Sequence, residues 1–170
     1  MSEDGLPILP HTTAEFYAWL WWTSELQEAA FSLEEVGNIE LWIDERLGFR
    51  EPNDSKITAL MTGDHPSTTL EARAALAGGK ALNELRIGLR RDDREFSVTL
   101  KGPAMYLQRV KLPEVMTEGV DERLYDRMFL YEELCYVLQA LFREYTRLRT
   151  SDEWAKEVLP QMQRWIVGQV

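Results

Sequence analysis

Strict alternation of apolar and polar residues around a short polar turn is the feature that most constrains the fold of this chain. The apolar members of the pattern are Leu85, Ile87, Leu89, Phe96, Val98 and Leu100. Side chains of a strand point alternately to opposite faces, so a period of two predicts a strand with one buried face. The pattern therefore predicts a β-hairpin that turns at residues 91–94, with one face in a core and the other in water.

The polar side of this hairpin, with the segment that follows it, is basic in an otherwise acidic protein. Residues 80–111 carry eight basic and four acidic side chains, a net charge of +4, whereas the whole chain carries −10. The basic residues are Lys80, Arg86, Arg90, Arg91, Arg94, Lys101, Arg109 and Lys111. A local reversal of charge on strands is expected of a polyanion-binding surface, and without a base-reading motif the binding would be nonspecific. A solvated hairpin whose arginines pair with cross-strand acids is an equally weighted alternative.

The second prominent feature is an unbroken apolar segment at residues 16–22, which includes Trp19, Trp21 and Trp22. It follows an extended lead-in at residues 1–11 and a capping-box spacing of Thr12 and Glu15, so we predict a helix over residues 13–29. Apolar side chains on all sides require that this helix be sandwiched between other elements or form an oligomer interface. We favour core packing over a base-stacking platform, and the three tryptophans are the interface candidates.

Together with the other segments of the chain, these features predict one α+β domain over residues 1–170. Short apolar runs predict strands at residues 31–34, 39–44, 46–51, 56–62 and 106–112, and the short connections among the first of these favour an antiparallel meander. Helical periodicity predicts helices at residues 66–76 and 121–149, and a C-terminal helical extension within residues 150–170 that Pro160 kinks or breaks. The predicted architecture is an antiparallel sheet of short strands packed with a long amphipathic C-terminal helix and the Trp-rich helix.

Residues suited to catalysis are few. Cys135 is the only cysteine and falls within a helical pattern, where we expect a buried, inert thiol. His11 and His65 are the only histidines and lie in predicted loops, so we expect no catalytic residues, no metal site and no cofactor. A metal-dependent nuclease remains a distant alternative, because convergence of carboxylates is not readable from sequence. An acidic N-terminus without a signal-peptide pattern, and the absence of any long apolar span, predict a cytoplasmic protein with no membrane partner.

The order of these segments resembles the C-terminal half of the recombination-associated protein RdgC family. The resembling region runs from the Gly79-Lys80 link through both hairpin strands and residues 107–112 into the helix at 122–149, and residues 15–21 are similar to a segment of shorter relatives. The resemblance implies nonspecific binding of DNA, chiefly duplex, by a ring-shaped homodimer on the bacterial nucleoid that restrains a RecA-type recombinase. It assigns the phosphate contacts to Arg86, Arg90, Arg94, Lys101, Arg109 and Lys111.

A function of another class is also open, namely an acidic protein-interaction or assembly module that binds no nucleic acid. Residues 1–64 carry thirteen acidic and only three basic side chains, so a protein partner could dock on the acidic strands or on the Trp-rich helix. Exposed tryptophans would favour this reading, because large exposed apolar patches mark partner sites.

Overall fold

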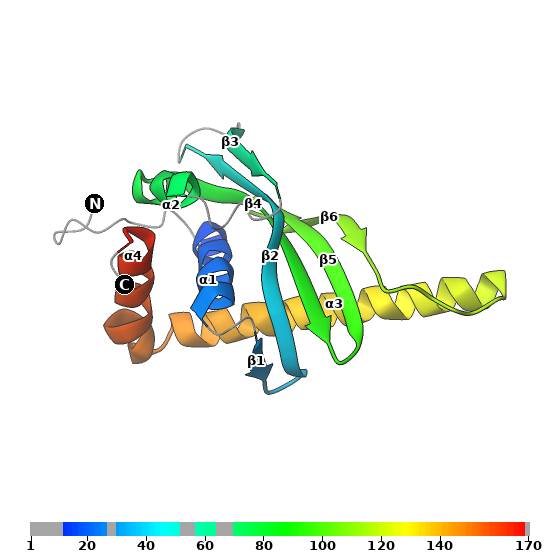
Figure 1. The fold of residues 1–170 in the computed structure, drawn as a ribbon. Helices are drawn as coiled ribbons and strands as arrows, with labels where there is room; N and C mark the ends of the chain where they lie inside the picture. The colour runs from blue at the N-terminus through cyan, green and yellow to red at the C-terminus, as the bar shows by residue number, and fades with distance from the viewer. Residues whose placement is uncertain (1–11, 27–29, 52–56, 64–69, 169–170) are drawn as a thin grey trace.

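A six-stranded antiparallel sheet with helices packed on it forms the fold, which confirms the predicted α+β class (Figure 1). The computed structural model describes residues 12–26, 30–51, 57–63 and 70–168. The strands are β1 (Ala30–Leu33), β2 (Gly37–Arg50), β3 (Ile57–Thr62), β4 (Ala81–Arg91), β5 (Arg94–Lys101) and β6 (Tyr106–Lys111). The helices are α1 (Thr12–Leu26), α2 (Leu70–Ala77), α3 (Val120–Arg149), the π-helical turn η2 (Trp154–Val158) and α4 (Leu159–Ile166).

The long strand β2 organises the sheet, and here the sequence prediction was wrong. A break was expected at residues 44–45, but β2 is continuous and instead shifts register against β4 between Ile43 and Leu47. One edge of β2 pairs with β1 at residues 37–40 and with β3 at residues 46–50, while its other edge pairs with β4. The sheet is therefore not a simple meander, because β4 pairs with β2 and not with β3, the strand that precedes it in the chain.

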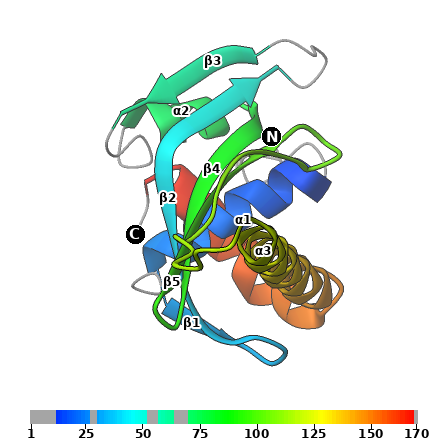
Figure 2. The ribbon, with the colours of Figure 1, turned by 90° about the vertical axis from the view of Figure 1, so that its right-hand side faces the viewer.

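Helices α1 and α3 lie on one face of the sheet, and α4 packs against α1 beyond it (Figures 1 and 2). The predicted alternation of the hairpin is confirmed, since Leu85, Ile87 and Val98 are completely buried toward these helices. Alternate residues, such as Arg86 and Thr99, stand on the opposite side, which we call the outer face. Burial of the apolar set thus leaves the outer face as the surface on which Arg86, Arg90 and Lys101, the predicted basic residues of the alternate set, must act.

The Trp-rich helix α1 is sandwiched between the sheet and the other helices. Trp19, Trp21 and Trp22 are 3 %, 0 % and 9 % exposed, so they belong to the core of a single chain. Core packing is confirmed, and the expectation that these residues form an interface is corrected. The correction has a local cause, because Trp21 packs edge-on against Trp165 of α4 at a centroid distance of 4.9 Å.

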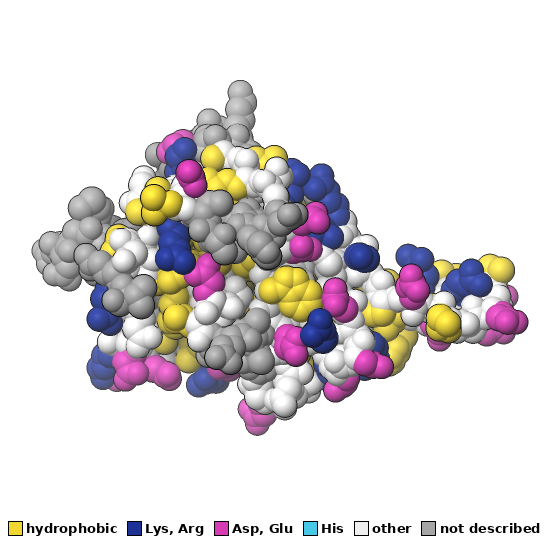
Figure 3. Space-filling view, in the orientation of Figure 1, with side chains coloured by type: hydrophobic (Ala, Val, Ile, Leu, Met, Phe, Trp, Pro, Cys, Tyr) yellow, Lys and Arg dark blue, Asp and Glu magenta, His cyan; other side chains and the backbone are white. Residues whose placement is uncertain are grey.

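Helix α3 begins and ends close to its predicted limits but is not uniformly packed. From Leu130 onward one side is buried in the core, including Leu134 and Tyr145. Residues 120–129 are all exposed and project from the body of the molecule as what we call the α3 arm (Figures 1 and 3). Pro160, predicted to kink the last helix, stands in the first turn of α4, directly after the π-helical turn.

Two further expectations have structural outcomes. Cys135 is only partly buried, so the expected burial of this thiol was wrong; it lies where α3 leaves the core. None of the helices in the described part of the chain combines the length and the apolar composition needed to cross a bilayer.

Candidate nucleic-acid interface

The outer face aligns basic side chains of β4 with acidic or hydroxyl side chains of the neighbouring strands. In the β4–β5 register, Arg86 lies opposite Thr99 and Arg90 lies opposite Glu95. On its other side Arg90 lies opposite Glu40 of β2, and its guanidinium is 2.8 Å from the Glu40 carboxylate and 3.4 Å from that of Glu95. Cross-strand pairing therefore offsets much of the basic charge of this face, as the alternative reading of the sequence expected.

Six of the eight basic residues of the predicted DNA-binding segment form ion pairs within the chain. These six are Lys80, Arg86, Arg90, Arg91, Arg94 and Lys101. Arg109 and Lys111 on β6 are exposed, and neither forms an ion pair with any other residue that the structure describes. Of these eight residues, the two most available to an external anion are therefore on β6, at the end of the predicted basic segment.

Arg91 and Arg94, at the turn of the hairpin, point toward a helix rather than toward a ligand. Both approach the carboxylate of Glu133 on α3, at 3.1 Å and 2.8 Å. Glu133 is buried, so its charge needs these two partners. We conclude that this pair of arginines attaches the hairpin to α3 and contributes little to an anion site.

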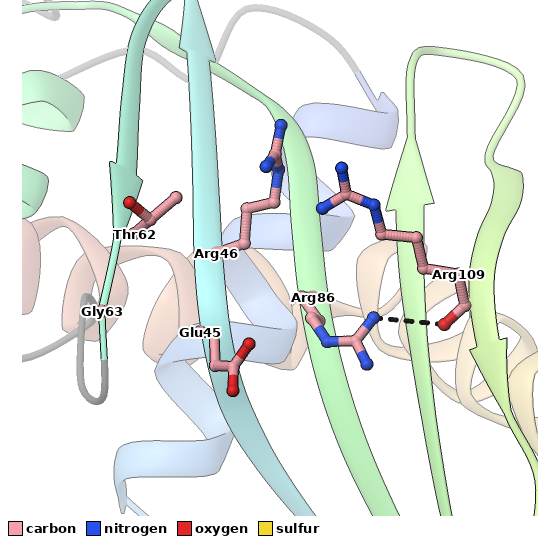
Figure 4. A pocket seen from close by; sticks show the side chains of 6 residues that line it. All are labelled: Glu45, Arg46, Thr62, Gly63, Arg86 and Arg109. Carbon is pink, nitrogen blue, oxygen red and sulfur yellow. Dashed lines mark hydrogen bonds between the residues drawn. The ribbon is translucent and has the colours of Figure 1, made fainter.

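Three arginines from three strands line one hollow of about 360 Å³ on the outer face, which we call the arginine hollow (Figure 4). Arg46 comes from β2, Arg86 from β4 and Arg109 from β6. The remaining lining residues are Glu45, Thr62 and Gly63. The backbone N–H of Gly63 donates to the carbonyl oxygen of Glu45 at 3.1 Å, which closes the β2–β3 side of the hollow.

Arg86 lines the arginine hollow and is held in place by hydrogen bonds. Its Nε donates to Asp44 at 3.2 Å, and its Nη1 donates to the Thr99 hydroxyl at 3.3 Å and to the Arg109 carbonyl at 3.1 Å. Asp44 also accepts a 3.1 Å hydrogen bond from Ser97. With a side chain only 15 % exposed, Arg86 is held by the sheet and primarily stabilises it.

Arg46 is the lining arginine that the sequence pattern did not single out. Its Nε donates to Glu84, a carboxylate only 2 % exposed that also lies 3.6 Å from Lys101 Nζ. The sequence pattern predicted a break at residues 44–45, but the irregular pairing there keeps Arg46 within a continuous strand and presents it to the hollow. The alternation of apolar and polar residues is interrupted between Ile43 and Leu47 in an otherwise regular strand pattern. This interruption was the signal in the sequence that could have indicated Arg46, because a β-bulge changes the direction in which a side chain points.

Arg109 has an unusual backbone for an arginine. Its φ is +49°, and the β5–β6 register is irregular opposite this position, between Ser97 and Thr99. A positive φ is uncommon outside glycine and costs energy, so it persists where surrounding contacts hold it. Here the carbonyl accepts from Arg86, while the guanidinium extends toward that of Arg46 across the hollow (Figure 4).

An aromatic side chain lies beside the cations on the outer face. Trp42 of β2 packs over Gly88 of β4, where an added Cβ would come within 2.0 Å of the indole. The Arg90 guanidinium stands 5.7 Å from the indole centroid, within cation–π range. Trp42 was not among the residues predicted for the site, but an aromatic next to arginines is the combination on which unpaired bases stack.

Among the residues that the structure describes, no group of three or more His, Cys, Asp or Glu side chains is arranged to hold a metal ion. His11 and His65 lie outside the described residues. Nothing in the described geometry therefore supports the nuclease alternative.

Comparison with known proteins identified no relative, since no family model, curated protein or solved structure matches this chain. The resemblance to RdgC therefore stays a prediction.

Proposed function

We propose that this protein binds DNA without sequence specificity, through phosphate contacts centred on the arginine hollow. The observation that carries the proposal is that Arg46 and Arg109, from strands far apart in sequence, line the same hollow with their guanidinium groups (Figure 4). The planar fork of a guanidinium matches two phosphate oxygens, which makes arginine the preferred partner of this group.

The electrostatics of the hollow support an anionic occupant. Arg46 is paired with Glu84 and Glu45 also lines the hollow, so the attraction for an anion comes chiefly from Arg109, while Arg46 offers its outer nitrogens as hydrogen-bond donors. Arg46 is oriented by Glu84 through its Nε, so its outer nitrogens face the hollow. Arg109 and Lys111 add positive charge that no ion pair within the described chain offsets.

The small number of unpaired basic side chains on the outer face predicts modest affinity for DNA. Most other basic residues of the outer face are already paired, and the net charge of −10 opposes approach of a polyanion. We expect a dissociation constant of roughly 10⁻⁴ to 10⁻⁶ M at physiological salt, with a salt dependence set by the few phosphates contacted. In a role of the RdgC type, such binding would occupy DNA that a recombinase needs, with no bond made or broken.

The decisive experiment is a fluorescence-anisotropy titration of labelled duplex and single-stranded DNA at low and at physiological salt. The test variant is Arg109→Glu with Lys111→Glu, because both side chains are exposed and neither holds the sheet together through an ion pair. The matched control is Lys156→Glu with Arg164→Glu, which changes the net charge equally on the C-terminal helical segments.

We expect the wild type and the control to bind with a steep salt dependence and no sequence preference, and the β6 variant to bind at least tenfold more weakly. Absence of wild-type binding at low salt would overturn the proposal. Equal binding by the two double variants would also overturn it, because the arginine hollow would then not be the contact surface.

A second candidate, the protein-assembly module, gains support from a different surface than the one expected. Burial of Trp19, Trp21 and Trp22 removes the Trp-rich helix as a docking site. The α3 arm instead exposes large apolar side chains, including Phe129 at 62 %. Exposed apolar surface of this kind marks interaction sites.

A further inference from the structure

We propose that the outer face prefers single-stranded to duplex DNA, because Trp42 is a platform on which an unpaired base stacks. The proposal rests on the phosphate binding proposed above for the arginine hollow, and it adds the class of DNA that the surface selects. Phosphates are present in both forms of DNA, whereas a base is free to stack on a protein side chain only where no second strand holds it.

Trp42 differs from the other tryptophans of the chain in its exposure. Trp19, Trp21, Trp22, Trp154 and Trp165 are between 0 % and 9 % exposed and belong to the core. Trp42 is only half-buried, because it alternates along β2 with the buried residues Leu41 and Ile43 and therefore lies on the outer face. Helices α1 and α3 pack on the opposite face of the sheet, so the indole of Trp42 borders solvent.

The indole lies flat on the sheet above Gly88. The two residues are directly opposite each other in the β2–β4 register. An added Cβ at Gly88 would lie 2.0 Å from Cε2 of the indole and 2.3 Å from both Cζ2 and Nε1. Such similar distances to three neighbouring ring atoms place this Cβ position below the plane of the ring, not at its edge. One face of the indole thus rests on the backbone of β4, which leaves the other face for a ligand.

Arg90 stands beside the platform and is fixed there. Its guanidinium is 2.8 Å from the carboxylate of Glu40 and 3.4 Å from that of Glu95. Glu40 and Arg90 form the next outer-face pair along the two strands, so the carboxylates hold the guanidinium to one side of the Trp42–Gly88 pair. At 5.7 Å from the indole centroid, Arg90 adds a cation–π contact that orients the ring before any base arrives.

A row of residues across the sheet leads from the indole to an exposed cation. Gly88 pairs with Ser97 of β5, and Ser97 pairs with Lys111 of β6. The middle of this row is low, because Gly88 has no side chain and Ser97 is buried, with its hydroxyl donating to Asp44 at 3.1 Å. Lys111 is exposed and forms no ion pair with another residue in the described part of the chain. A base on the indole therefore has a free cation for a phosphate of the same strand.

The arginine hollow adjoins this row. Arg86 precedes Gly88 by two residues on the same face of β4, a distance of about 7 Å along a strand. One extended strand of DNA can thus place a phosphate at the hollow and the neighbouring base on Trp42. A duplex can offer the phosphate alone, since its bases are paired and stacked on one another.

Electrostatics alone predicts the opposite preference. A duplex carries one negative charge per about 1.7 Å of its axis, whereas a single strand of the same helix carries one per about 3.4 Å. A surface that uses only Arg46, Arg109 and Lys111 would therefore bind the duplex more tightly. Tighter binding of a single strand is the result that requires the platform, and the low specificity of stacking agrees with recognition of any sequence.

Fluorescence anisotropy at low salt with three labelled ligands tests the proposal. The ligands are oligothymidine, a duplex of the same length, and an abasic strand with the same number of phosphates as the oligothymidine. The test variant is Trp42→Ala, the conservative variant is Trp42→Phe, and the matched control is Tyr136→Ala, an exposed aromatic residue on α3. Circular dichroism establishes that each variant is folded.

We expect the wild type to bind oligothymidine at least fivefold more tightly than the duplex or the abasic strand. Trp42→Ala should lose this preference and keep its affinity for the duplex, while Trp42→Phe and Tyr136→Ala should retain most of the preference. Intrinsic fluorescence gives a second readout that does not depend on the alanine variant. Saturating oligothymidine should quench part of the tryptophan emission of the wild type and none of that of Trp42→Phe, because the other tryptophans are buried.

Equal or tighter binding of the duplex by the wild type, without quenching, would overturn the platform and leave the phosphate-binding function standing. Equal loss of duplex and oligothymidine binding in folded Trp42→Ala would also overturn it, since Trp42 would then support the sheet and not the ligand. Absence of binding to all three ligands would overturn both proposals. Binding of a neutral oligosaccharide that is lost in Trp42→Ala would assign the indole to carbohydrate and equally overturn the proposal.

Discussion

The guanidinium of Arg94 lies 2.8 Å from the carboxylate of Glu133, an ion pair that joins the tip of the β4–β5 hairpin to the middle of α3. Arg91 approaches the same carboxylate at 3.1 Å. Two residues that the sequence offered as phosphate ligands therefore serve tertiary structure. The same contact marks where α3 leaves the core, because the residues that precede Leu130 in the helix are exposed.

Replacing Glu133 with alanine should release the hairpin from α3. Because hydrogen bonds to charged groups contribute about 1.5–3 kcal/mol and both arginines are about one-third exposed, we expect the free energy of unfolding to fall by roughly 1–2 kcal/mol. Urea denaturation measures the loss, and faster amide exchange at the hairpin locates it. Glu132→Ala, at the exposed neighbouring position, is the control and should change stability by less than about 0.5 kcal/mol.

Arg86→Glu should destabilise the sheet, whereas Arg109→Glu should not. Reversal at residue 86 removes three hydrogen bonds and places a second carboxylate beside Asp44, so we expect a loss of roughly 3 kcal/mol. The side chain of Arg109 forms no ion pair with another described residue. Thermal unfolding of the two variants compares the same charge reversal at residue 86, which is hydrogen-bonded within the sheet, and at residue 109, which is exposed. Equal melting temperatures would contradict the structural role of Arg86.

Gly88→Val should strain the outer face, because the new side chain would occupy the space of the Trp42 indole. Overpacking typically costs about 1–3 kcal/mol, and we expect a loss of that size. The double variant Gly88→Val with Trp42→Ala should recover part of it, since removal of the indole opens the space. A double-mutant cycle from chemical denaturation measures this coupling, and additive losses would refute the contact.

Tyr145→Phe should destabilise the contact between α1 and α3. The Tyr145 hydroxyl donates a 2.6 Å hydrogen bond to Glu15, a buried carboxylate that also accepts from Arg149. Removing the donor leaves Glu15 with one partner fewer, so we expect a loss of about 1–3 kcal/mol in urea denaturation. Tyr136→Phe, on the exposed side of α3, serves as control and should leave stability unchanged.

The same tyrosine makes stability sensitive to alkaline pH. Burial, reinforced by the hydrogen bond and charge of Glu15, raises the pKa of Tyr145, and burial raises the pKa of Tyr17. The stability contributed by the neutral hydroxyls is present below the unfolded-state pKa of about 10 and is lost as the pH rises above it. Unfolding free energies measured between pH 8 and 11 should fall only above about pH 10, and the fall should be smaller in Tyr145→Phe. An identical decline in both proteins would contradict this prediction.

Local pattern was sufficient to predict most elements of the fold. The alternation at Leu85, Ile87 and Leu89 defined a strand face, because the two-residue period of a strand is a property of the backbone alone. The helical period likewise placed α3 within one residue of its observed start. The continuity of β2 was missed, since a bulge at residues 44–46 resembles a turn until a neighbouring strand pairs across it.

What the sequence determined by itself is which side chains share a face and where basic charge gathers along the chain. Only the tertiary structure decided which of those charges form ion pairs within the protein and which remain exposed. Glu40, Asp44 and Glu133 are distant in sequence from the arginines they pair with, and the sheet and α3 bring them together. The same packing buried Trp19, Trp21 and Trp22 and left the α3 arm exposed. Periodicity is set by local backbone geometry, but pairing and burial depend on contacts between distant segments, which no local pattern encodes.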